Sequence, residues 1–98
     1  MQVFVSAYAL GVMEGGIGGN GEWFRRTLVG QTLGDNPKLI AFDAFGKKRC
    51  EQLNSIVPGS MLKVHYTIDA HEHDGKWYNR INLERFEAYT SVPKNTVQ

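Results

Sequence analysis

The chain has 98 residues, of which 42% are hydrophobic and 21% charged, so it is long enough for one domain with one core and too short for two. Its net charge of +1 excludes a histone-like polycation, and any nucleic-acid role must therefore rest on a local patch. The lone cysteine, Cys50, excludes an intrachain disulfide framework and a cysteine-based zinc cluster. The sequence contains no apolar run near the ~20 residues of a membrane span and no basic segment ahead of its apolar start, which predicts a cytoplasmic protein.

The first third of the chain predicts a hairpin. Residues 2–13 are rich in β-branched, aromatic and small side chains and predict a long strand with a bend or bulge near Gly11. Residues 14–22 hold five glycines and predict a mobile loop, since glycine loses much backbone entropy on ordering. A phosphate-cradling loop is disfavoured because neither a helix start nor Gly-Lys-Ser/Thr follows. Residues 23–33 predict the second strand, with neither face cleanly apolar.

The middle of the chain predicts a third strand and a helix. After a turn at 34–37, residues 38–45 alternate, with Ile40, Phe42 and Ala44 on the apolar face. Phe45 is then a large aromatic side chain on the face that carries Asp43. Residues 46–57 predict one short amphipathic helix, ended by Pro58-Gly59, whose buried positions are Cys50, Leu53 and Val57.

The last part predicts a second hairpin. Residues 61–70 alternate most clearly, and their inward positions are Leu62, Val64, Tyr66 and Ile68. Residues 71–75 predict a turn around Asp74-Gly75, and residues 76–87 the last strand, with Ile81 and Leu83 on one face. The order β-β-β-α-β-β predicts an all-β, five-stranded OB-fold barrel with one short helix between strands three and four. The expected domain spans 1–89, followed by a short polar tail at 90–98.

Four segments carry a family resemblance: GEW (21–23), AFDAFGKK (41–48), VPGSMLKVHYTID (57–69) and DGKWYNRINLERFE (74–87). Their order and spacing resemble those of bacterial and phage single-stranded DNA-binding proteins. They also look like those of a smaller group of short, uncharacterised bacterial OB-fold proteins. The opening strand departs from the first family's pattern, and the long linker and acidic C-terminal tip are missing from a chain that ends NTVQ. The resemblance therefore implies strand binding by a tail-less, phage- or plasmid-encoded or primosomal type of protein.

Non-specific binding of a single strand needs aromatic faces for the bases and cations for the phosphates. The candidate nucleic-acid-binding residues are Trp23, Arg25, Arg26, Phe45, Lys47, Lys48, Trp77 and Arg80. The family resemblance also implies a stacking aromatic at Phe45. Arg25 and Arg26 are neighbours on a strand, so at most one of them lies on the binding face.

Each candidate also has a purely structural interpretation. Trp23 and Trp77 also fit a barrel-end core or a dimer interface, and Phe45 fits a position under the helix. The run from Lys47 to Arg49 fits a solvated first turn, although cations there oppose the helix dipole.

Catalysis and metal binding find little support. His71, His73 and Asp74 share one tight hairpin with no distant partner, which indicates a polar turn rather than a metal site. Cys50 is expected in the core, where thiols are inert. The sequence shows neither a triad order nor a cofactor fingerprint, so we expect no enzyme and no cofactor.

The sequence therefore predicts non-sequence-specific binding of single-stranded DNA in replication, recombination or conjugation. RNA in place of DNA stays open, because no identifiable residue reads a 2′-hydroxyl. A homodimer or tetramer is expected, since an exposed edge of the first strand invites pairing. The alternative is an OB-like adaptor whose aromatic face binds a protein partner or a small ligand. The near-zero net charge and Asp43 on the proposed face favour that alternative.

Overall fold

The computed structural model describes residues 1–89, and the expected tail at 90–98 lies outside them. The elements are β1 (Gln2–Leu10), β2 (Glu14–Gly18), β3 (Gly21–Thr32), β4 (Leu39–Phe45), α1 (Lys47–Gln52), the 3₁₀ turn η1 (Leu53–Ser55), β5 (Met61–His73) and β6 (Lys76–Tyr89). The predicted all-β class is confirmed. Within the described residues, neither helical segment has the length and apolar character to cross a bilayer.

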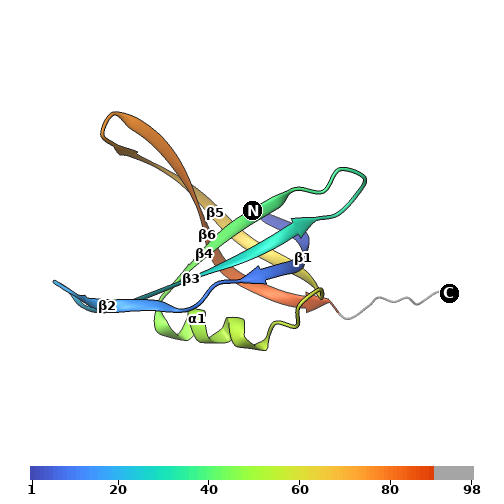
Figure 1. The fold of residues 1–98 in the computed structure, drawn as a ribbon, viewed down its shortest axis with the longest axis horizontal. Coiled ribbons are helices and arrows are strands. Elements are labelled where there is room, and N and C mark those ends of the chain that lie inside the picture. The colour runs from blue at the N-terminus through green and yellow to red at the C-terminus, as the bar shows by residue number, and fades with distance from the viewer. Residues whose placement is uncertain (90–98) are drawn as a thin grey trace.

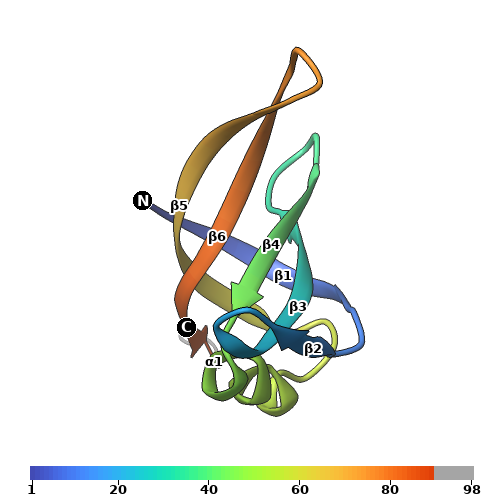
Figure 2. The same cartoon turned by 90° about the vertical axis from the view of Figure 1, so that its left-hand side faces the viewer.

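Five strands pair into a closed ring (Figure 2). β1 lies between β3 and β5, β5 pairs with β6, and β4 pairs with β3. The ring closes where β4 meets β6 in parallel at Asp43 and Asn82. With α1 between β4 and β5, this arrangement matches the predicted five-stranded OB-fold barrel.

The core fills the inside of this ring. Its fully buried side chains come from all five barrel strands and the helical segment: Val5, Leu28, Phe42, Ala44, Cys50, Leu53, Leu62, Val64 and Leu83. Of the inward positions predicted by alternation in β4 and the first half of β5, Phe42, Ala44, Leu62 and Val64 are fully buried. Ile40 and Tyr66 are partly buried and pack against the core. Burial of the valine, leucine and phenylalanine side chains among them, at roughly 1.5–3 kcal/mol each, is the main driving force for folding.

Two predicted core positions are wrong. Val57 is exposed, and Ile56 packs against the core in its place, because a 3₁₀ turn interrupts the helical spacing after Leu53. Ile68 is also exposed, since β5 has left the barrel by that point and its alternation continues into solvent.

The β5–β6 hairpin is longer than predicted. β5 continues to His73, and a two-residue turn at Asp74-Gly75 leads directly into β6. Both turn residues have positive φ, 53° and 79°, as a type I′ hairpin turn requires. The Asp-Gly signal in the sequence thus marks the turn correctly, whereas the flanking residues 71–73 belong to the strand.

The first hairpin also differs from the prediction. The glycine-rich segment is not a loop: residues 14–18 form β2, which pairs with β3 from Glu14↔Arg25 to Gly18↔Gly21. β1 ends at Leu10, and its irregularity lies between Ala7 and Ala9 rather than at Gly11. The expectation that β1 has an exposed edge is wrong, because it pairs with β3 on one side and β5 on the other.

Candidate nucleic-acid interface

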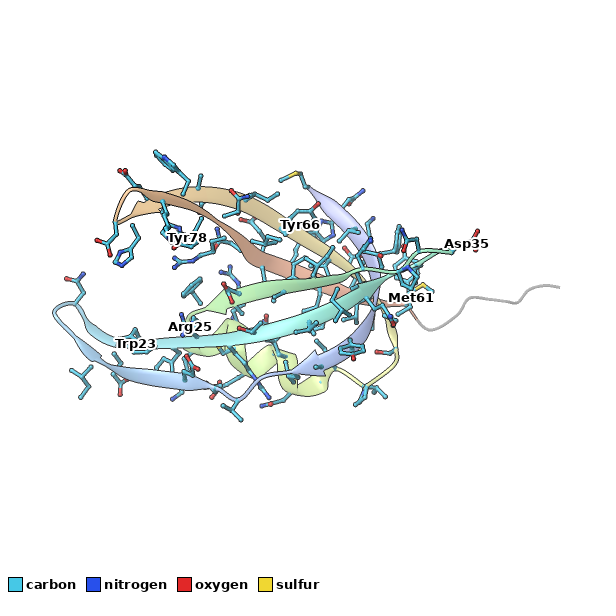
Figure 3. All side chains as sticks on the ribbon, turned by 45° about the horizontal axis from the view of Figure 1, so that its top comes forward. Trp23, Arg25, Asp35, Met61, Tyr66 and Tyr78 are labelled. Carbon is cyan, nitrogen blue, oxygen red and sulfur yellow. The ribbon has the colours of Figure 1, made fainter. Side chains whose placement is uncertain are left out.

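Two hairpins extend from the barrel and give residues 1–89 an elongated shape (Figure 1). One consists of β2 and the first half of β3, and the other of the distal halves of β5 and β6. In Figure 3, Trp23 and Arg25 lie on the first hairpin and Tyr78 lies on the second, across from them. The surface of β3 and β4 that faces away from the core joins the two hairpins. We call this surface, with its continuation onto β2 and onto the distal halves of β5 and β6, the outer face.

The register of β3 and β4 brings three predicted residues onto the outer face. Arg25 pairs directly with Phe45, and Trp23 lies two residues before Arg25 on the same side of the strand. The exposed fractions are 47% for Trp23 and 37% for Phe45. Both rings are therefore partly packed and partly available to a ligand.

The position of Trp23 explains the glycines of β2. Trp23 pairs with Gly16, and a Cβ atom at Gly16 would come within 3.0 Å of the indole Nε1. On the other side of the strand, a Cβ at Gly15 would come equally close to the ring of Phe24. The aromatic rings thus cover the glycines and order the segment, as cross-strand aromatic residues do for edge glycines.

Arg80 reaches the outer face from β6. Its guanidinium lies over the Phe45 ring, 5.3 Å from the centroid, within the range of a cation–π contact. Tyr78 lies two residues before Arg80 on the same side of β6, is 46% exposed, and stacks with His71 at 5.8 Å. The outer face therefore continues along the second hairpin.

Trp77 does not lie on this face. It alternates with Tyr78 and Arg80 and pairs with Glu72, so it points to the opposite side of the hairpin. It is the most exposed of these aromatic residues, at 70%. The sequence analysis selected Trp77 as the aromatic residue of this strand on the binding face, whereas the structure places Tyr78 on the outer face. Counting in steps of two from Arg80 would have identified Tyr78.

Charges on the outer face are balanced rather than strongly basic. Glu14 pairs with Arg25, and this hydrogen bond raises the pKa of the guanidinium. Two carboxylates are held by neighbouring polar side chains: Asp43 accepts from Thr27 at 2.9 Å, and Asp69 accepts from Asn82 at 2.6 Å. Arg25, Arg80 and Lys76, which lies two residues before Tyr78 on β6, thus share the face with three carboxylates.

Arg26 points away from the outer face, toward the helix. Its Nε donates to the carbonyl of Gly11 at 2.8 Å, and its Nη1 donates to Asn54 Oδ1 at 2.6 Å and the carbonyl of Cys50 at 3.3 Å. These bonds connect the β1–β2 loop to the helical segment. Of the two neighbouring arginines, only Arg25 lies on the outer face.

Lys47 and Lys48 follow Phe45 directly, in the first turn of α1. The Lys47 Nζ lies 6.0 Å from the centroid of the Phe24 ring, at the limit of a cation–π contact. Lys48 is exposed. Both lie beside the outer face rather than on it.

His71, His73 and Asp74 lie at the tip of the second hairpin. His73 and Asp74 form an exposed ion pair at 3.3 Å. Across residues 1–89, no three His, Cys, Asp or Glu side chains converge in a way that would hold a metal ion.

Cys50 is fully buried, and its thiol donates to the carbonyl of Ala44 at 3.4 Å. Burial raises the pKa of this thiol, and the thiolate is the reactive form. We therefore expect iodoacetamide to leave the native protein unlabelled and to label the chain stoichiometrically in denaturant. Rapid labelling of the native protein, followed by intact mass, would contradict this prediction.

The fold and the site define a small β-barrel protein with an aromatic and cationic outer face. Residues 9–87 match the family model described as "Domain of unknown function (DUF3127)", and the chain belongs to this family. Among solved structures, the small single-stranded DNA-binding protein from Streptomyces coelicolor is similar, with a TM-score of 0.48 and 9% identity over 92% of this chain and 93% of that chain. A search of curated proteins gave no match.

Proposed function

We propose that this protein binds single-stranded nucleic acid without strong sequence preference, through its outer face, and acts as a binding module rather than an enzyme. The observation that carries the proposal is the exposed Phe45 ring in contact with Arg80, with Trp23 along the first hairpin and Tyr78 along the second. Three aromatic rings on one face offer stacking surfaces for successive bases, and stacking tolerates any sequence because every base has a π-face.

The biological setting belongs to the same proposal. DNA is the preferred ligand, with a role in replication, recombination or conjugation in the cytoplasm, as a homodimer or tetramer. One edge available for pairing between copies is that of β2, which pairs with β3 on one side.

The test is a fluorescence titration with dT and rU oligonucleotides at two salt concentrations. The chain has two tryptophans, so Trp77→Phe leaves Trp23 as the reporter and Trp23→Phe leaves Trp77. We expect quenching in Trp77→Phe and almost none in Trp23→Phe, because only Trp23 lies on the outer face. Tighter binding of dT than rU would support DNA.

The adaptor function is the second candidate, and the three carboxylates on the outer face favour it. Carboxylates repel phosphates but suit a polar protein surface. If Trp77→Phe, which keeps Trp23, shows neither quenching nor binding of an oligonucleotide at low salt, the strand-binding proposal is rejected and the adaptor function is favoured.

A further inference from the structure

An open groove adjoins the outer face on the side of α1. It lies between α1 and β6, and Phe45 contributes to its lining as well as to the outer face. Figure 2 shows the end of β4 meeting α1, with β6 beside it. The lining residues that matter here are Phe45, Lys47, Lys48, Arg49, Glu84 and Arg85. We call this site the basic groove.

The basic groove and the outer face differ in charge. Four cations and one carboxylate line the groove, whereas the three cations of the outer face (Arg25, Lys76 and Arg80) are matched by three carboxylates. Arg85 also pairs with Glu87 at 2.9 Å, which offsets part of its charge. The groove nevertheless keeps a positive excess, and it carries the cations that the outer face lacks for neutralising phosphates.

The cations of α1 are not explained by helix stability. The first turn of α1 has no acidic residue, and Gly46 provides no side-chain cap. Lysines at this end of a helix are disfavoured, because their charge opposes the helix dipole. Lys47 has a packing partner in Phe24, but Lys48 has none of the hydrogen bonds, ion pairs or cation–π contacts found within residues 1–89.

We propose that the basic groove binds the phosphate backbone of the same single strand whose bases stack on the outer face. This inference rests on the proposed function and divides it between two surfaces. The outer face supplies stacking, which depends little on salt, and the groove supplies most of the phosphate contacts. Phe45 joins the two, since it borders both.

The test measures oligonucleotide affinity against salt for the double variant Lys48→Gln/Arg85→Gln, which removes one cation from each side of the groove. Each phosphate contact to a single strand contributes about 0.7 to the slope of log K against log salt, so we expect the slope to fall by about 0.7–1.4. The matched control is Lys38→Gln/Lys63→Gln, which removes two cations outside the groove. It should keep the parent slope.

Oligonucleotide length provides a second measurement. A strand of about three nucleotides, shorter than the ~4–16 nucleotides that one OB-fold covers, should bind the variant and the parent alike if it occupies only the outer face. A longer strand should separate them. If the parent protein binds long strands and Lys48→Gln/Arg85→Gln has the same salt slope as the parent, the groove does not bind phosphates. The proposed function would then remain intact. If the parent protein binds no strand at low salt, the proposed function itself is rejected.

Discussion

Replacing Phe45 with alanine is expected to weaken binding of a dT oligonucleotide by about 5- to 150-fold, the range that follows from the ~1–3 kcal/mol of one base–aromatic stack. Phe45 has the strongest claim to this role because it lies between β3 and β6 and carries Arg80 on its ring. The ring is 37% exposed, so its removal should lower affinity more than stability. Fluorescence anisotropy of labelled dT measures the affinity, and thermal unfolding checks the fold.

Two variants serve as controls for this prediction. Phe45→Tyr keeps an aromatic ring and should stay within a few-fold of the parent affinity. Trp77→Ala removes a larger and more exposed ring from the opposite side of the hairpin and should leave affinity within about twofold, since it lies off the outer face. If Phe45→Ala binds dT as well as the parent but loses self-association, Phe45 belongs to a protein interface and the adaptor function gains support.

The salt dependence separates stacking from phosphate contacts. Phe45→Ala removes an uncharged group, so it should lower affinity by a similar factor at low and high salt. Lys48→Gln/Arg85→Gln should instead change the slope, because fewer counterions are released on binding. The two variants together test whether the outer face and the basic groove have the separate roles proposed for them.

The alternation of apolar and polar side chains predicted the strands of the barrel, because most of these strands have one face in the core and one in solvent. In β4 and the first half of β5, the pattern identified Phe42, Ala44, Leu62 and Val64 as inward positions, and all four are buried. Alternation failed at Ile68, which continues the pattern after β5 has left the barrel. Hydrophobic patterning records the two sides of a strand and not the point where the core ends.

The candidate site was only partly predictable, because it depends on pairing between distant strands. Phe45 and Arg25 were identified from their own strands, and their register makes them direct partners. The order of the glycine segment comes from Trp23 and Phe24 on the neighbouring strand, which local composition does not reveal. The sequence analysis selected Trp77 and not Tyr78 as a candidate, whereas the parity of β6 places Tyr78 on the outer face.

Gly30→Ala is the substitution expected to destabilise the barrel most for its size, by about 1–3 kcal/mol. Gly30 is buried in β3 and pairs with Ala7 of β1 and Ile40 of β4. A Cβ atom there would lie 2.6 Å from Cγ2 and 2.8 Å from Cβ of Val5, which is itself fully buried. Val5 is β-branched and has little freedom to rotate away. β1 and β3 would therefore have to separate at this point of the barrel wall.

Thermal unfolding measures this effect, with an expected fall in Tm of roughly 4–8 °C for each kcal/mol lost. Gly19→Ala is the matched control: no atom lies within 4 Å of its added Cβ, so the change should stay within about 0.5 kcal/mol. Val5→Ala removes the methyl groups that clash. Val5→Ala/Gly30→Ala should therefore lose less stability than the two single variants added together, by about 0.5–3 kcal/mol. Equal Tm values for Gly30→Ala and Gly19→Ala would show that the close approach of β1 and β3 does not constrain the barrel.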